Sequence, residues 1–217
     1  MQNKNEIQEV SKKTGISVKE LNRLNQDFWH HGTTIEDAEN IRENGVIANY
    51  NLGLELDFGP GFYLTDTYQR AINYISRVPS TMYSGGIQER EDWAIIEFAF
   101  NPYELLFSKE NIYSYRNFPK HNKAFAEFVF RNRMNNREKE NPHKFDLIWG
   151  VMSDSNPEQV VWDYKNQKIS YEKVIQLLQK SNSMKQLFIS NQEICDMLVI
   201  NNIFMKEDNG YARKINN

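Results

Sequence analysis

The alternation of apolar and polar positions divides the chain into short strands and amphipathic helices. Runs rich in β-branched and aromatic residues, bounded by turn signals, predict strands at 28–32, 61–65, 93–100, 145–152, 159–164 and 185–190. Apolar residues at helical spacing predict helices at 34–44, 67–75, 123–134 and 170–180, and a short one behind residue 190. Strands and helices interleave without a regular βαβ rhythm, and no GxGxxG follows a strand. We therefore expect an α+β fold and not a doubly wound parallel sheet.

Several predicted helices begin and end at recognisable signals. A Ser or Thr followed three residues later by Glu forms a capping box, and Asp66 can cap the helix behind it. Asn44-Gly45 provides a C-terminal stop for the helix before it. The capping boxes are Ser17/Glu20, Thr33/Glu36 and Ser190/Glu193.

The first 26 residues predict a helical pair broken at Thr14-Gly15. We expect residues 1–26 to form a short helical appendage and residues 27–217 to form the main domain. The stretch "SKKTGISVKELNRL" has the pattern of a helix-turn-helix, so a nucleic-acid regulator is one alternative for function. Helical pairs of this kind are more often simple packing units.

Composition narrows the class of protein. A chain of 217 residues with 40% hydrophobic and 13% aromatic residues can build a sizeable core. The net charge of -3 argues against a general nucleic-acid binder. The single cysteine, Cys195, excludes an internal disulfide and fits a reducing compartment. The N-terminus lacks a signal-peptide pattern, and no run approaches the roughly 20 apolar residues of a membrane span. We expect a cytoplasmic protein without a membrane partner.

The common metal and nucleotide motifs are missing from the sequence. There is no HExxH, CxxC or P-loop, and the four histidines do not show metal-ligand spacing, so no metal site is expected. The adjacent His30 and His31 should point to opposite faces of a strand.

The stretch "DFGPGFYLTDTYQRAINY", residues 57–74, is the most informative part of the chain. A Gly-Pro-Gly turn leads directly into Phe62 and Tyr63, and Tyr74 follows on a helix. A strand tyrosine and a helix tyrosine can hold a flat ring between them. For either tyrosine alone, core packing is the alternative. His31-Gly32-Thr33 closes another strand, where glycine permits close approach of the backbone to a ligand.

"HHGTT", "DFGPGFYLTDTYQRAINY" and "KQLFIS" together resemble the three signature segments of the ADP-ribosyltransferases. The branch is the one shared by diphtheria toxin and the poly(ADP-ribose) polymerases, with its His, Tyr, Glu pattern. More narrowly, the chain looks like small bacterial transferase-like proteins suspected to be toxins of toxin–antitoxin pairs. These carry "DFGxGFYxT", a helix ending in "NR", a strand like "FDLIWG" followed by an acidic-asparagine loop, and a last strand beginning with Gln. In this chain the helix is "AFAEFVFRNR", the loop is "SDSN" and the last strand begins at Gln186. The resemblance spans residues 28–200.

The resemblance implies a split β-sheet core with flanking helices, and NAD as substrate. By this resemblance His31 bonds a ribose hydroxyl, and Gly32, with Thr33 beside it, offers its backbone to the nicotinamide carboxamide. Tyr63 and Tyr74 enclose the nicotinamide ring. Arg133 pairs with the pyrophosphate, the alternative being a solvated charge at a helix end.

Gln186 falls where this branch usually keeps its catalytic glutamate. Loss of nicotinamide leaves an oxocarbenium-like ribose, which a carboxylate stabilises and a glutamine meets only with a dipole. The resemblance therefore predicts transfer of a single ADP-ribose by the catalytic set Gln186, His31 and Tyr63. A catalytically silent module that binds NAD or ADP-ribose is the alternative. The sequence leaves open whether another carboxylate substitutes, the candidates being Glu97, Glu127 and Glu193.

The expected acceptor is a macromolecule, either protein or nucleic acid, in a bacterial or phage conflict, with an antitoxin as a further partner. The segment 119–144 is locally basic and is interleaved with Phe118, Phe125 and His121. It could receive an acidic or nucleic-acid substrate. Its alternative interpretation is a solvated surface.

Overall fold

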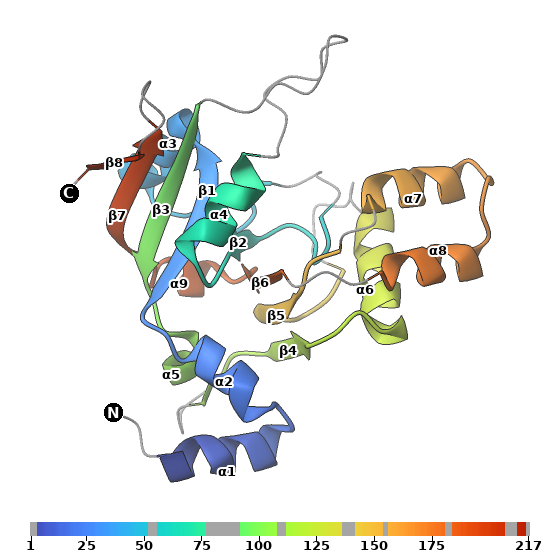
Figure 1. Cartoon of the computed structure of the whole chain (residues 1–217), viewed down its shortest axis with the longest axis horizontal. Helices are drawn as coiled ribbons and strands as arrows, with labels where there is room; N and C mark the ends of the chain where they lie inside the picture. Colours follow the sequence, from blue (N-terminus) through green and yellow to red (C-terminus); the bar gives the residue numbers. More distant parts are fainter. Residues whose placement is uncertain are drawn as a thin grey trace. The chain divides into compact units, whose positions relative to one another are not determined.

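The computed structural model describes residues 4–51, 56–76, 92–107, 112–135, 142–153, 156–180 and 184–206, and the backbone of 212–215. The described elements form a mixed α+β protein with two β-sheets, as the sequence predicts (Figure 1). The strands are β1 Phe28–Thr34, β2 Phe62–Leu64, β3 Trp93–Ala99, β4 Tyr115–Phe118, β5 Leu147–Val151, β6 Lys185–Ile189, β7 Val199–Lys206 and β8 Ala212–Ile215. The helices are α1 Lys4–Thr14, α2 Val18–Leu24, α3 Ile35–Asn44, α4 Tyr68–Ile75, α5 Pro102–Phe107, α6 Lys123–Met134, α7 Pro157–Lys165, α8 Tyr171–Leu178 and α9 Gln192–Cys195.

The chain divides into two compact units. The first unit contains residues 1–46, 64–111 and 196–217. Its sheet has the order β1-β3-β7-β8, and all of its pairs are antiparallel. Helices α3 and α4 pack against this sheet, and α4 buries Ala71 and Ile75 beside Trp93 and Ile95. Figure 1 shows α4, in turquoise, beside β1 and β3.

The second unit contains residues 47–63 and 112–195. Its sheet has the order β2-β6-β5-β4, in which β4 and β5 are parallel and β5 and β6 are antiparallel. Helices α6, α7 and α8 form a cluster at one side of this unit, in yellow and orange in Figure 1. Its core is strongly aromatic: the fully buried Phe58 contacts the rings of Phe118, Phe125 and Phe188.

Side-chain caps fix where most of the described helices begin. Ser17 accepts a hydrogen bond from the backbone of Glu20, as predicted, and Gly45 ends α3 at φ 77°. Two predicted caps are wrong by one residue, because Thr34 caps α3 and Thr67 caps α4. The predicted cap Ser190 is also wrong: its hydroxyl donates to the carbonyl of Phe145, and Asn191 accepts from the backbone of Glu193 instead.

The prediction of a strand at 159–164 is wrong, since these residues lie in α7. Asn156 caps this helix and Pro157 occupies its first turn, both favourable helix-start features. Helical spacing buries Val160 and Val161 while Trp162 stays exposed. Packing against α6 and α8 thus overrides the strand preference of "VVW". The unpredicted elements are α5, β4, β7 and β8. The expected loop at 78–86 lies outside the described residues.

The N-terminal helices belong to the first unit. Helix α2 packs against α5, and Asn101 donates a hydrogen bond of 3.1 Å to the side chain of Asn25. Cys195 is buried and is not part of a disulfide. Among the helices that the structure describes, none has both the length and the apolar character needed to cross a bilayer.

Candidate functional site

Strand β1 carries three of the predicted site residues, His31, Gly32 and Thr33, on an edge of the first sheet. His30 exchanges two backbone hydrogen bonds with Thr65 across this outer edge, at 3.0 and 2.8 Å. In an antiparallel ladder, residues two apart direct their backbone groups to the same side. The N–H and C=O of Gly32 therefore point toward the outer edge of β1, away from β3.

His30 and His31 lie on opposite faces of β1, as the strand period requires. His30 is buried and its Nε2 lies 3.3 Å from Oε2 of Glu97. The other carboxylate oxygen of Glu97, Oε1, accepts hydrogen bonds from the amides of Asn201 and Asn202. Burial lowers the pKa of His30, and the nearby Glu97 only partly offsets this. His31 is half-buried. The buried histidine of the pair is thus an internal partner of Glu97, and His31 is the one left nearer the surface.

Gly32 is required by helix packing. A Cβ at this position would lie 2.7 Å from the carbonyl oxygen of Ala71 and 3.1 Å from Cβ of Ile75. The absence of a side chain therefore lets α4 approach β1. Tyr74 lies on the same helix, where its side chain is 43% exposed.

The turn that precedes Tyr63 is held by hydrogen bonds from several directions. The Asn51 amide donates to the Gly61 carbonyl at 2.7 Å and accepts from its N–H at 2.9 Å. The Tyr63 hydroxyl donates to the Gly59 carbonyl at 2.7 Å and accepts from the Phe58 N–H at 3.1 Å. Gly59 adopts φ 86°, a conformation that favours glycine. This network fixes the half-buried ring of Tyr63 beside Phe58 and Phe188.

Arg133 forms a buried ion pair with Asp57 at the start of this turn. Its Nε and Nη2 donate to Oδ1 of Asp57 at 3.0 and 2.6 Å. Ser153 donates to the same carboxylate from its hydroxyl at 2.6 Å and its backbone at 2.9 Å, and Asn132 bonds the Asp57 carbonyl. Burial by itself raises the pKa of Asp57, but Arg133 and Ser153 outweigh it and hold that pKa below its usual value. The interpretation of Arg133 as a solvated helix-end charge is wrong.

Gln186 lies on β6, the neighbour of β2 in the second sheet. Its side chain is buried, and its Nε2 donates no hydrogen bond to any residue that the structure describes. Phe188 follows two residues later on the same face of the strand, with its ring centroid 5.1 Å from that of Tyr63. The structure thus brings Tyr63 and Gln186 to adjacent strands of one unit. His31, Gly32, Thr33 and Tyr74 belong to the other unit.

The three carboxylates that were candidates to replace a catalytic glutamate at position 186 lie in three different environments. Glu97 is engaged by His30 and two asparagines in the first unit. Glu127 lies on α6 and accepts a hydrogen bond from the Tyr171 hydroxyl at 3.3 Å. Glu193 is exposed on α9, where its backbone N–H bonds to Asn191.

Comparison with protein families gives one match. The sequence profile described as "Protein of unknown function (DUF3990)" matches residues 46–200. The chain belongs to the DUF3990 family. Comparison with curated proteins and with solved structures gives no match. The DUF3990 segment contains the whole 57–63 turn, Arg133 and Gln186, whereas β1 with its His31 and Gly32 precedes it.

Sequence reasoning missed most of the polar residues that build the site in the DUF3990 segment. The side chains of Asn51, His143 and Ser153 all form hydrogen bonds to residues of the turn, and the turn residue Asp57 binds Arg133. The clearest signal in the sequence was Asp57, which opens the stretch 57–74. Among the described residues, no group of three or more His, Cys, Asp or Glu side chains is arranged to hold a metal ion.

Two of the three aromatic residues interleaved with the basic segment 119–144 are not available to stack on an acceptor. Phe118 and Phe125 are buried in the core, and the His121 ring contacts the Met152 carbonyl at 2.7 Å. Of the arginines near the end of α6, Arg133 is buried and Arg131 is exposed. Residues 136–141 of this segment lie outside the described part of the chain.

His143 makes the stability of the turn sensitive to pH. Its Nε2 donates to the Phe58 carbonyl at 2.7 Å, and its Nδ1 accepts from the Phe145 N–H at 3.2 Å, which requires the neutral ring. Burial lowers the pKa of His143, although the bond to Phe58 partly offsets this. The unfolded chain therefore binds this proton at a higher pH than the folded chain does. The contribution of neutral His143 to the free energy of unfolding is fully present above the unfolded pKa of about 6.5. This contribution is lost as pH falls toward the pKa of His143 in the folded chain.

We expect the free energy of unfolding to fall from about pH 7 to about pH 5, and to fall less in the His143→Gln variant. Glutamine keeps a donor for Phe58 but does not titrate in this range. Urea unfolding of both proteins at the two pH values measures the difference. Equal pH dependence in the two proteins would contradict the assignment. Some dependence remains in the variant because the pKa of His30 is also lowered.

Proposed function

We propose that the chain binds NAD and transfers one ADP-ribose unit from it to a macromolecule. The signature segments that resemble the ADP-ribosyltransferases suggest this activity, and the geometry of each unit is compatible with it. As the resemblance assigns them, His31, Gly32, Thr33, Tyr63, Tyr74 and Arg133 bind NAD, while Gln186, His31 and Tyr63 take part in the chemistry.

The buried amide of Gln186 carries the proposal. A buried donor without a partner costs about 1–3 kcal/mol, so folded proteins rarely retain one without a use. Nε2 of Gln186 has no partner in the described part of the chain and lies on the strand next to Tyr63. A ribose hydroxyl oxygen is an acceptor that satisfies this group. The glutamate of the ADP-ribosyltransferases that the chain resembles orients a ribose hydroxyl too, but it does so as an acceptor.

The outer edge of β1 gives further support. The backbone N–H and C=O of Gly32 point to this edge, where they match the complementary donor and acceptor of a carboxamide. Tyr74 has an exposed ring and Tyr63 a half-buried ring, so each can offer a surface to a flat pyridinium. Arg133 supports the proposal less directly, since Asp57 already engages its guanidinium.

In the proposed reaction, the bond between ribose C1′ and the nicotinamide nitrogen breaks and nicotinamide leaves with the bonding electrons. A nucleophilic oxygen or nitrogen of the acceptor bonds to C1′ and releases its proton to solvent. Gln186 orients the ribose through its amide but supplies no negative charge to the developing cation. This difference restricts the proposal to transfer of single units. The acceptor is a protein or a nucleic acid, and a toxin role with an antitoxin partner fits the same resemblance.

The neutral side chain of Gln186 also favours a second candidate, a silent module that binds NAD or ADP-ribose without turnover. Incubation of the full chain with NAD labelled in the adenylate separates the two. Transferase activity produces labelled macromolecules in a cell lysate together with free nicotinamide. Binding of NAD without either product identifies the silent module, and absence of binding contradicts both candidates.

Variants of Tyr63 and Gln186 test the assigned roles. We expect Tyr63→Ala to weaken NAD binding by about 1–3 kcal/mol, because the stacking surface is lost. Tyr63→Phe is the matched control, since it removes the hydroxyl that closes the turn and keeps the ring. Gln186→Ala should lower kcat more than it raises KM. Calorimetric titration and steady-state kinetics measure these effects, and equally small effects of all three variants would refute the assignment.

A further inference from the structure

We propose that the cluster of α6, α7 and α8 contains a second binding site, which takes a purine nucleotide. A cavity of about 300 Å³ lies between these helices. Its lining includes three aromatic rings and three polar side chains, namely Phe130, Tyr164, Tyr171, Glu127, Arg131 and Asn135. The site lies wholly within the second unit and involves none of the residues assigned to NAD, so it does not depend on the proposed transferase.

The aromatic residues form a fixed surface on which a base can stack. The Phe130 ring packs edge to face against Tyr164 at 5.0 Å and against Tyr171 at 5.6 Å between centroids. These contacts restrain the rings, while 38% of Tyr171 stays exposed. Stacking on an aromatic side chain tolerates any base, and purines offer the larger face.

Arg131, one of the lining residues of the cavity, can bind an anion. Arg131 is exposed and makes no ion pair with any residue in the described ranges. Arg133, two residues later, differs from Arg131 because its guanidinium is buried and paired with the carboxylate of Asp57. An arginine without a carboxylate partner, next to a stacking surface, is suited to a phosphate group.

Glu127 gives the site a preference for guanine. Its Oε1 accepts from the Tyr171 hydroxyl at 3.3 Å and lies 3.6 Å from Nζ of Lys123. Its Oε2 has neither a hydrogen bond nor an ion pair to the described residues. An ionised carboxylate only accepts hydrogen bonds. Guanine presents two adjacent N–H donors on its Watson–Crick edge, whereas adenine presents one donor beside an acceptor.

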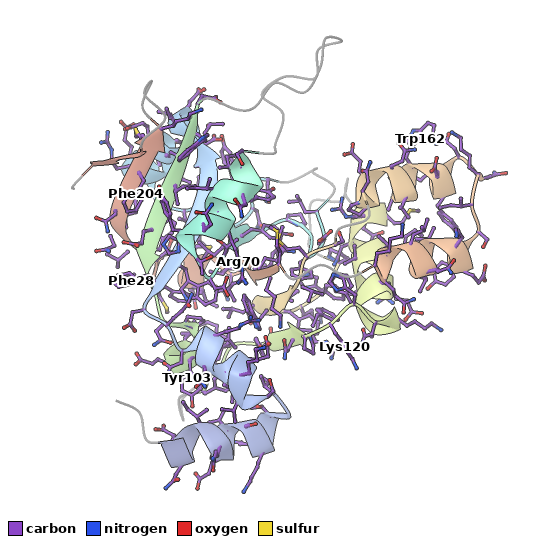
Figure 2. All side chains as sticks on the ribbon, in the orientation of Figure 1. Phe28, Arg70, Tyr103, Lys120, Trp162 and Phe204 are labelled. Atoms are coloured by element: carbon purple, nitrogen blue, oxygen red, sulfur yellow. The ribbon has the colours of Figure 1, made fainter. Side chains whose placement is uncertain are left out.

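The nucleotide can be free or part of a single strand, and both sources share the same chemistry. The experiment is calorimetric titration of the full chain with 5′-GMP, 5′-AMP, guanosine and a single-stranded RNA of mixed sequence. The variants are Tyr171→Ala, Arg131→Gln and Glu127→Gln. Two substitutions outside the cavity lining are matched controls. Arg116→Gln changes an exposed arginine on β4, and Trp162→Ala removes an exposed ring on α7 that Figure 2 labels.

We expect Tyr171→Ala to weaken GMP binding about tenfold or more, as measured for stacked bases. Arg131→Gln should weaken binding of GMP but not of guanosine, and Glu127→Gln should abolish the preference for GMP over AMP. The controls should bind as the parent does. Tighter binding of RNA with the same dependence on the variants identifies a strand as the source, and equal or tighter binding of GMP identifies a free nucleotide.

Two results overturn the proposal. One is that neither GMP nor RNA binds, and the other is that binding is unchanged in both Tyr171→Ala and Arg131→Gln. Failure here is distinguishable from failure of the transferase proposal, because Gln186→Ala should leave GMP binding unchanged. If the chain binds GMP through α6 to α8 but does not bind NAD, the nucleotide site is supported and the transferase proposal is contradicted.

Discussion

Replacing Arg133 with methionine is expected to lower the free energy of unfolding by about 3–5 kcal/mol. The substitution leaves the carboxylate of Asp57 buried without its cation, and such uncompensated charges are among the most costly single changes. Arg133 also bonds Asp57, the residue that opens the 57–63 turn. Removing Arg133 should therefore disturb the turn and the position of the Tyr63 ring at its end. Urea unfolding monitored by circular dichroism measures the effect.

Arg131→Met is the matched control, because it removes the same side chain from the same helix at an exposed position. Its effect should stay within about 0.5 kcal/mol. The double variant Asp57→Asn with Arg133→Met should recover part of the loss, since the charge is removed while asparagine still accepts from Ser153. A loss below about 1 kcal/mol for Arg133→Met would show that the pair is not the support of the turn.

The sequence predicted well those elements in which one face is buried and both ends carry local signals. Helix α6 has the predicted bounds, 123–134, because Asn122 caps it and its apolar positions follow the helical period. The strands β1, β3 and β6 were found for similar reasons. In each case short-range preference and long-range packing agree.

The elements that were wrongly predicted or not predicted are those whose secondary structure depends on contacts with residues far away in the sequence. "QVVWDY" has strand-like residues, yet α6 and α8 together provide the surface that its helical form buries. Strand β7 contains Asn201 and Asn202, which interrupt its apolar pattern, and its register with β3 shifts between Glu97 and Phe98. Their side chains bond Glu97, a partner about a hundred residues earlier that no local pattern reveals.

The features of the candidate site also fall into those that local sequence specifies and those that depend on distant residues. The strands that carry Tyr63 and Gln186 could be predicted from short stretches of sequence, whereas the roles assigned to the two residues stay predictions. The partner of Arg133 could not, since 76 residues separate it from Asp57. Gly32 was expected to allow close approach of a ligand to the backbone. The structure shows that its missing side chain also lets α4 approach β1, and the ligand contact stays a prediction. A sequence can show that a glycine is needed, but the fold shows which neighbour needs it.

Gly61 connects the turn to the strand that carries Gln186. A Cβ at this position would lie 2.1 Å from Cε2 and 2.6 Å from Cζ of Phe188, and 2.8 Å from the carbonyl oxygen of Ile189. Phe188 is fully buried among other aromatic rings, so its ring has no space into which to move. Either the turn or β6 must shift to accommodate even one methyl group.

We therefore expect Gly61→Ala to lower the free energy of unfolding by about 3 kcal/mol, which is near the upper end of the usual cost of overpacking a core. Urea unfolding measures this loss. Because Gln186 precedes Phe188 by two residues, NAD binding should weaken in the same variant if the proposed function holds. The double variant Gly61→Ala with Phe188→Leu removes the ring edge that clashes and should recover part of the stability. Recovered stability without recovered NAD binding would assign the Phe188 ring a direct part in holding Tyr63. A stability of Gly61→Ala within about 1 kcal/mol of the parent would contradict the close contact of Gly61 with Phe188 and Ile189, because the turn and β6 could then separate at little cost.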